Sequence, residues 1–306
     1  MTTERTFGVA LVAARSGPVG PRRLLARAAF LLLGALPLAS PAATPAASDD
    51  PQAAASGADA PLSFGPRTSW FAVKSRDPQA VASALGLTAL VARNWATGLA
   101  AATARAGSAG EPSVFLASPI DGWILVVSSS LPYPDHRPRR SEAEARIDQR
   151  FDDAFTALAA RFDEVQFFAS NRVQGFSAWA RARHARIERI FAYADGEVLA
   201  NVGRQSIEEA ALRFPDITGL GLDAARNALL AAAALRERDE EQRLADGPDR
   251  RPADAALHAH GSAPIPDEDE VFTLAGAWSV NPFILEGRGL PAGTGLGAVL
   301  PAELRQ

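Results

Sequence analysis

The stretch AWARARHARIERIFAYADGEVLANVG, Ala178 to Gly203, decides the fold. Apolar and polar residues alternate along three short runs, and a period of two residues predicts β-strands. Asp195 and Gly196 separate the second and third runs, and they favour a two-residue turn in which both residues take positive φ. His184 and Ala185 occupy the preceding turn, where Ala suits positive φ poorly, so we expect that turn to be longer or distorted.

Three further apolar stretches predict the other strands. SWFAVKS (Ser69 to Ser75) and EVQFFAS (Glu164 to Ser170) have the composition of strands. SVFLASPIDGWILVVSS (Ser113 to Ser129) holds two apolar runs, and the second, Trp123 to Val127, is apolar at consecutive positions, as in a central strand covered on both faces. The sequence therefore predicts an α+β fold, a curved and mainly antiparallel β-sheet of about six to seven strands with helices packed on it.

Capping residues and apolar positions three and four apart predict four helices. Asp267 followed by Glu270, for example, suits a capping box in which each residue satisfies a backbone N–H group of the other. The Ser141 helix carries an apolar stripe from Ile147 to Phe162, which we expect to lie on the sheet. The expected helices span residues 77–86, 141–162, 223–243 and 267–281.

Changes in composition along the chain predict its organisation. A segment rich in Ala, Pro and Ser buries too little apolar surface to offset the entropy of ordering. A charged segment and a Gly-rich end are also expected to lie outside the core. The expected parts are a signal-like segment (1–43), a disordered Ala/Pro linker (44–63), an α+β core (64–214), a charged helix with a disordered insert (215–265), a helix completing the core (266–283) and a loose Gly-rich tail (284–306).

Residues 1–43 have the order of a secretory signal. Arg22 and Arg27 precede an apolar run from Ala28 to Ala39, and small residues follow it. The run of about 12 residues is shorter than the about 20 that a membrane-spanning helix needs, so no stable span is expected. The sequence therefore predicts a periplasmic or secreted protein. The alternatives are a membrane anchor formed by the uncleaved segment and a cytoplasmic protein with an N-terminal extension.

Charge and cysteine content exclude several classes of function. The chain contains no Cys, which excludes disulfides, thiolate catalysis and Cys-ligated zinc. Its formal net charge is −4, and removal of residues 1–43, which carry five Arg and one Glu, would leave −8. Because a phosphate-tracking groove needs clustered Lys and Arg, this acidic balance argues against general nucleic-acid binding.

Five short segments occur in an order that resembles a family of uncharacterised bacterial proteins. They are WFAVK, PIDGWILVVSSSLP, FDEVQFFASNR, AWARARHARIERIFAYADGEV and VFTLAGAWSVNP, and the likeness covers residues 69–282 apart from the charged insert. The resemblance implies a shared fold and no assigned activity. This sequence departs from the family pattern at two places. It has His184 and Ala185 where the pattern implies an Asp-Gly turn, and it has an export-like N-terminus.

Motifs of well-known enzymes are absent from the sequence, which contains no GxSxG elbow, HExxH, P-loop or EF-hand loop. The segment Gly219 to Ala224 imitates a dinucleotide loop, but the residues before it make a poor strand. His258 and His260, with Asp254 nearby, are residue types that bind divalent metals, but they lie in the insert that we expect to be disordered. We therefore expect neither a cofactor nor a metal site.

The candidate binding residues are Trp179, Arg181, Arg183 and Glu188. Alternation places the first three on one face of a strand, and a two-residue turn would set Arg181 opposite Glu188 and Trp179 opposite Ile190. Such a face could bind a carboxylate or an acidic partner through Arg, with Trp stacking on it. The alternative is an ordinary solvated sheet face with a cross-strand ion pair.

Two classes of function remain open at this point. The first is a non-enzymatic exported binding protein, of an immunity or inhibitor type, that blocks a partner protein through the outer face of the sheet. The second is a hydrolase with an unfamiliar active site, for which His184 or a carboxylate near Asp121 would be the catalytic group. Glu164 with Gln166 is a further acid–base candidate, although its position is explained by a helix-to-strand junction. The sequence favours the first class.

Overall fold

The computed structural model describes residues 57–104, 111–139, 141–245 and 266–306. The signal-like segment 1–43, most of the linker 44–63, and His258 and His260, which we did not expect to form a metal site, lie outside these ranges. Within the described residues, no helix combines the length and the apolar character that crossing a membrane requires.

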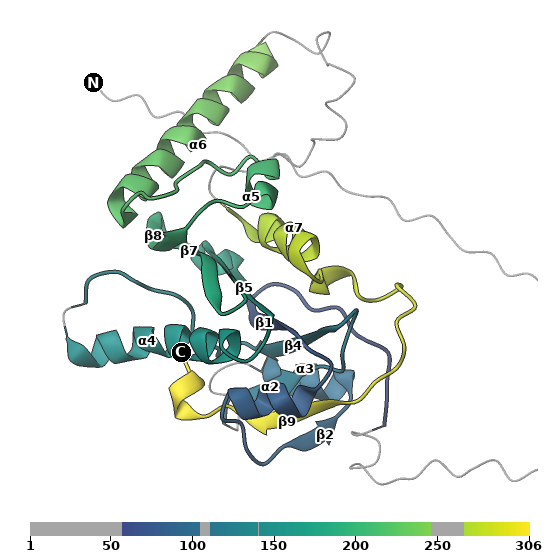
Figure 1. Ribbon diagram of the computed structural model, residues 1–306. Coiled ribbons are helices and arrows are strands. Elements are labelled where there is room, and N and C mark those ends of the chain that lie inside the picture. Colours follow the sequence, from purple (N-terminus) through teal and green to yellow (C-terminus); the bar gives the residue numbers. More distant parts are fainter. Residues whose placement is uncertain (1–56, 105–110, 140, 246–265) are drawn as a thin grey trace, which may run out of the picture. The chain divides into compact units, whose positions relative to one another are not determined.

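A single antiparallel sheet of nine strands, in the order β2-β9-β3-β4-β1-β5-β6-β7-β8, forms the centre of the domain (Figure 1). The α+β prediction is confirmed, and the predicted count of six to seven strands is too low. The strands are β1 (Thr68–Lys74), β2 (Val91–Arg93), β3 (Ser113–Leu116), β4 (Trp123–Ser128), β5 (Glu164–Asn171), β6 (Phe176–Arg183), β7 (Arg186–Ala194), β8 (Glu197–Gly203) and β9 (Gly295–Val299).

Helices cover both faces of this sheet. The first face packs against α2 and α4, and the second packs against α3, α6 and α7. The helices of the described residues are α2 (Pro78–Ala84), α3 (Trp95–Ala102), α4 (Glu142–Ala159), α5 (Ile207–Ala211), α6 (Leu222–Ala245) and α7 (Glu268–Trp278), with 3-10 turns η1 (Arg172–Gln174), η4 (Pro282–Ile284) and η5 (Ala302–Leu304).

Strand β1 shows why two apolar layers form. Phe71 and Val73 point into the first core, whereas Trp70 and Ala72 point into the second. The Trp70 ring stacks between Phe168 and Phe272, with centroids 5.3 and 5.7 Å away. Every residue of β4 is also buried, so the prediction of a central strand covered on both faces is confirmed.

The two ends of the domain differ from the sequence-based prediction. Asp59, placed in the linker, accepts hydrogen bonds from the backbone N–H groups of Trp95 (2.6 Å) and Ala96 (3.0 Å) at the start of α3. The ordered fold therefore begins before residue 64. The expectation of a loose tail is also wrong, because β9 lies between β2 and β3 in the sheet.

The β6–β7 hairpin has a two-residue turn and an altered register. Arg183 pairs with Arg186, so the turn contains only His184 and Ala185. Both residues take positive φ, 51° and 60°, although Ala suits this region poorly. Ala182 pairs with Ile187 but Arg181 pairs with Arg189, which leaves Glu188 as an extra residue in a β-bulge. The predicted register is therefore wrong: Arg181 lies opposite Arg189, and Trp179 lies opposite Phe191.

The capping box predicted at the start of α7 is present. The backbone N–H of Asp267 donates to Glu270 Oε2 at 2.8 Å, and Asp267 Oδ1 accepts from the N–H groups of Asp269 and Glu270. Burial of the Glu270 side chain, reinforced by the side-chain contact with the Asp267 carboxylate and opposed by the Asp267 backbone N–H, raises the pKa of Glu270 from 4.5 to about 8.

Glu270 should make the protein less stable as the pH rises. The folded state keeps the Glu270 proton up to about pH 8, whereas the unfolded chain releases it near 4.5, so the free energy of unfolding falls as pH rises across that window. Glu270→Gln keeps the cap and removes the titration. Urea unfolding at several pH values should show a flatter profile for Glu270→Gln than for the wild type, whereas Glu237→Gln on the exposed part of α6 should leave the profile unchanged.

Candidate functional site

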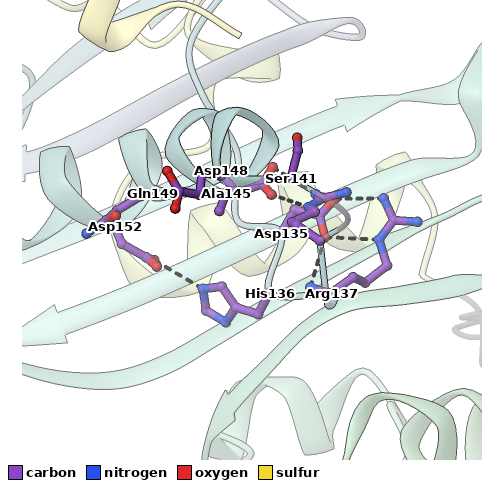
Figure 2. A pocket seen from close by; sticks show the side chains of 10 residues that line it. Asp135, His136, Arg137, Ser141, Ala145, Asp148, Gln149 and Asp152 are labelled. Atoms are coloured by element: carbon purple, nitrogen blue, oxygen red, sulfur yellow. Dashed lines mark hydrogen bonds and ion pairs between the residues drawn. The ribbon is translucent and has the colours of Figure 1, made fainter.

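A cavity of about 620 Å³ lies between the loop that follows β4 and the first half of α4 (Figure 2). We call it the α4 groove. Its volume falls within the range of about 300 to 1,000 Å³ that is usual for ligand sites. The described residues that line it are Asp135, His136, Arg137, Arg139, Ser141, Glu142, Ala145, Asp148, Gln149 and Asp152.

The loop wall of the groove is anchored by backbone and ring contacts. Tyr133 packs on Phe176 of β6 with ring centroids 4.9 Å apart, and the His136 backbone N–H donates to the Leu199 carbonyl of β8 at 2.8 Å. Ser141 then caps α4, since its hydroxyl accepts from the Glu144 N–H at 3.2 Å. The wall is therefore tied to the sheet before the chain turns into the helix.

Asp135 organises the positive charges of the groove. Its buried carboxylate accepts two hydrogen bonds from the Arg137 guanidinium, from Nε at 3.0 Å and from Nη2 at 2.7 Å, and it also pairs with Arg139. Burial alone would raise the pKa of Asp135, but the hydrogen bonds from the two Arg residues hold that pKa below its ordinary value. One carboxylate therefore holds two guanidinium groups in place.

The helix wall contributes Asp148 and Asp152, one turn apart on α4. Arg139 Nη2 donates to Asp148 Oδ1 at 2.8 Å, and His136 Nε2 lies 3.1 Å from Asp152 Oδ1. Figure 2 shows Asp152 on α4 pointing toward the His136 ring on the loop. The hydrogen bond with Asp152 raises the pKa of His136 above its ordinary value, although burial acts in the opposite direction.

Trp179, the first of the sequence-predicted binding residues, is not on a solvated face. Its side chain is 2% exposed and lies among aromatic rings, with centroids 4.6 Å from Phe191 and 5.3 Å from Phe214. Its indole N–H donates to Glu209 Oε1 at 2.9 Å. The predicted open face is wrong here because helices and loops from the later part of the chain cover this part of the sheet.

Arg181, Arg183 and Glu188 do lie together, although the bulge changes how they meet. Arg183 Nε donates to Glu188 Oε2 at 2.8 Å, while Arg181 Nε donates instead to Glu164 Oε1 at 2.9 Å. The Arg181 guanidinium is largely buried, 5.2 Å from the centroid of the Trp278 ring. Arg183 and Glu188 are partly exposed, and their role in binding a partner stays a prediction.

The catalytic candidates lie apart from the α4 groove. His184 Nδ1 contacts Asp163 at 2.6 Å on the exposed hairpin turn, and Asp121 pairs with Arg288 at 2.6 Å. Neither lines the α4 groove. The segment from Gly219 leads into α6, but α5 intervenes after the end of β8, so no strand opens directly into it as a dinucleotide loop requires.

Polar residues from several of the resemblance segments meet in one buried cluster. Gln166 Nε2 donates to Glu164 at 3.0 Å and to the Trp278 carbonyl at 3.1 Å, and the Ser279 hydroxyl donates to Gln166 Oε1 at 2.6 Å. Lys74 lies 3.8 Å from Glu164. This cluster joins β5 and β6 to the end of α7, and both carboxylate oxygens of Glu164 have a partner in it, Arg181 and Gln166 on Oε1 and Lys74 near Oε2.

The sequence reasoning missed the α4 groove. The available signals were the charged run Asp135 to Arg139 in the loop between an apolar strand and a helix, and two Asp residues spaced by four on that helix. No protein-family model, curated protein or solved structure matches this chain.

Proposed function

We propose that this chain is a non-enzymatic binding protein that takes a segment of a partner protein into the α4 groove. The observation that carries the proposal is a solvent-open cavity of about 620 Å³ in which four charged side chains, those of Asp135, Arg137, Arg139 and Asp148, are already held in place by one another. Because these groups are ordered before a partner arrives, binding would cost little side-chain entropy. Preorganised polar groups of this kind give specificity.

The lining favours a protein segment over a small molecule. Sites for small molecules are mostly apolar with a few polar groups, whereas Ala145 is the one apolar residue among the described residues that line this groove. Polar, water-accessible surfaces are typical of the rims of protein–protein interfaces. Export, predicted from residues 1–43, stays a prediction, which N-terminal sequencing of the protein from fractionated host cells would test.

Filling the groove should abolish capture of the partner. Ala145 is exposed on α4, so Ala145→Trp places a bulky ring in the groove without disturbing the core. Ala234→Trp makes the same change on the exposed side of α6 and is the matched control. In affinity capture from host extract, we expect at least one protein to bind the wild type and Ala234→Trp but not Ala145→Trp. Identical captured sets for all three proteins would contradict the proposal.

A further inference from the structure

We infer that the segment held in the α4 groove is basic, with Arg or Lys side chains that contact the carboxylates of α4. This inference rests on the proposed function and specifies the chemistry of the partner. It follows from how charge is distributed among the described lining residues, which include four carboxylates and two guanidinium groups.

The two guanidinium groups are already neutralised. Arg137 forms a two-point contact with Asp135, and Arg139 is held between Asp135 and Asp148. An acidic segment would have to compete with these fixed carboxylates for the same cations. The two Arg residues therefore stabilise the loop, and few of their N–H groups remain available to bind an anionic ligand.

The carboxylates of α4 retain free capacity. Glu142 is 92% exposed, and its contact with Arg146 is a 3.6 Å surface pair that solvent and salt weaken. Asp152 is 41% exposed and contacts only the His136 ring among the ion pairs of the described residues. Each carboxylate oxygen can accept further hydrogen bonds, so a guanidinium or ammonium group of a partner can bind here without displacing an existing ion pair.

His136 gives the same site a pH response. Its ring contacts Asp152 on α4, the charges of Asp148 on α4 and of Asp135 on its own loop also act on it, and its backbone N–H donates to the Leu199 carbonyl of β8. Protonation of His136 adds a positive charge beside Asp152, so a basic segment should bind more weakly at acidic pH and more tightly as the imidazole loses its proton.

Two synthetic peptides test the inference, one of alternating Arg and Ser and one of alternating Glu and Ser. Affinities are measured by calorimetry at about 0.15 M salt, where long-range attraction is screened. We expect the basic peptide to bind, and Glu142→Gln combined with Asp152→Asn to weaken it about tenfold. Glu237→Gln combined with Asp239→Asn makes the same charge change on exposed α6 and should leave the affinity unchanged. His136→Gln should remove the pH response of the wild type.

The outcomes separate this inference from the proposed function. No binding of the basic peptide, or equal weakening by the groove and α6 variants, would overturn the inference. Binding of the acidic peptide that Ala145→Trp abolishes would overturn the basic partner while leaving the groove as the binding site. If neither peptide binds and Ala145→Trp loses no captured protein, both proposals fail.

Discussion

Arg189→Met should destabilise the protein by about 3 to 5 kcal/mol, the cost of leaving a buried carboxylate without its cation. Arg189 Nε donates to Glu209 Oε1 at 2.8 Å, and the two side chains are 2% and 0% exposed. The same carboxylate accepts from the Trp179 indole, and its Oε2 accepts from the Ser206 N–H. Loss of Arg189 therefore leaves the buried Glu209 carboxylate without a counter-charge at the centre of a polar network.

This ion pair matters for α5 in particular. Glu209 is the one buried residue of that helix, while Ile207 is 83% exposed, so polar contacts, with this charge pair the most buried of them, hold α5 to the domain and no apolar stripe does. Arg189 Nη1 extends the network to Asn201 Oδ1 at 2.8 Å, and Asn201 Nδ2 donates to the carbonyl of Ile217. The network joins β7 and β8 to the segment that leads into α6.

A double-mutant cycle measures this coupling. Glu209→Gln keeps one acceptor oxygen, for either Trp179 or the cap of α5 but not for both, and it removes the charge that Arg189 balances. Urea unfolding of Arg189→Met, of Glu209→Gln and of the double variant should show that the double variant loses clearly less stability than the sum of the single losses. Additive losses, or a loss below about 1 kcal/mol for Arg189→Met, would show that the pair behaves like a surface ion pair.

Gly203→Ala should cost about 2 to 4 kcal/mol through strain and steric overlap. Gly203 has a φ of +82°, and a Cβ atom there would lie 1.9 Å from the Glu188 carbonyl oxygen, in the bulge of β7. Because the obstacle is backbone, relief requires β7 or β8 to move.

A second glycine separates the two contributions. Gly86 also has positive φ, at +66°, but a Cβ atom there would meet nothing within 4 Å. Gly86→Ala should therefore cost only about 1 kcal/mol, the conformational part alone. Both variants are compared with the wild type by urea unfolding. Equal losses for Gly203→Ala and Gly86→Ala would contradict the predicted overlap at the bulge.

Sequence patterns correctly predicted turns and helix caps that depend only on residues close together in the chain. The turn at Asp195 and Gly196 forms as predicted, with both residues at positive φ, and the capping box of α7 is also present. Strand β9 could not be predicted in this way, because it forms by pairing with β2 and β3, which lie far away in the sequence. A Cβ atom at Gly295 would lie 2.3 Å from the Leu116 carbonyl oxygen and 2.6 Å from the Phe115 ring, so glycine there permits close packing in the sheet and does not indicate a loose tail.

The candidate site shows a different limit of sequence reasoning. Alternation placed Trp179 and Arg181 correctly on one side of β6, but it does not say what covers that side, and here α7, which lies far along the chain, packs on the strand. The loop that carries Asp135 has no period to detect, and its pairing with α4 depends on contacts across the sheet. Burial by distant elements and loop geometry thus account for what the sequence could not predict.

Photo-cross-linking in the native host tests most directly whether the α4 groove is the binding surface. A photoreactive residue is introduced in place of Ala145 on α4 and, as a matched control, in place of Ala234 on α6. If the groove holds a partner segment, illumination will join another protein covalently to the Ala145 position and not to the Ala234 position. No adduct at Ala145, or the same adducts at both positions, would contradict the account.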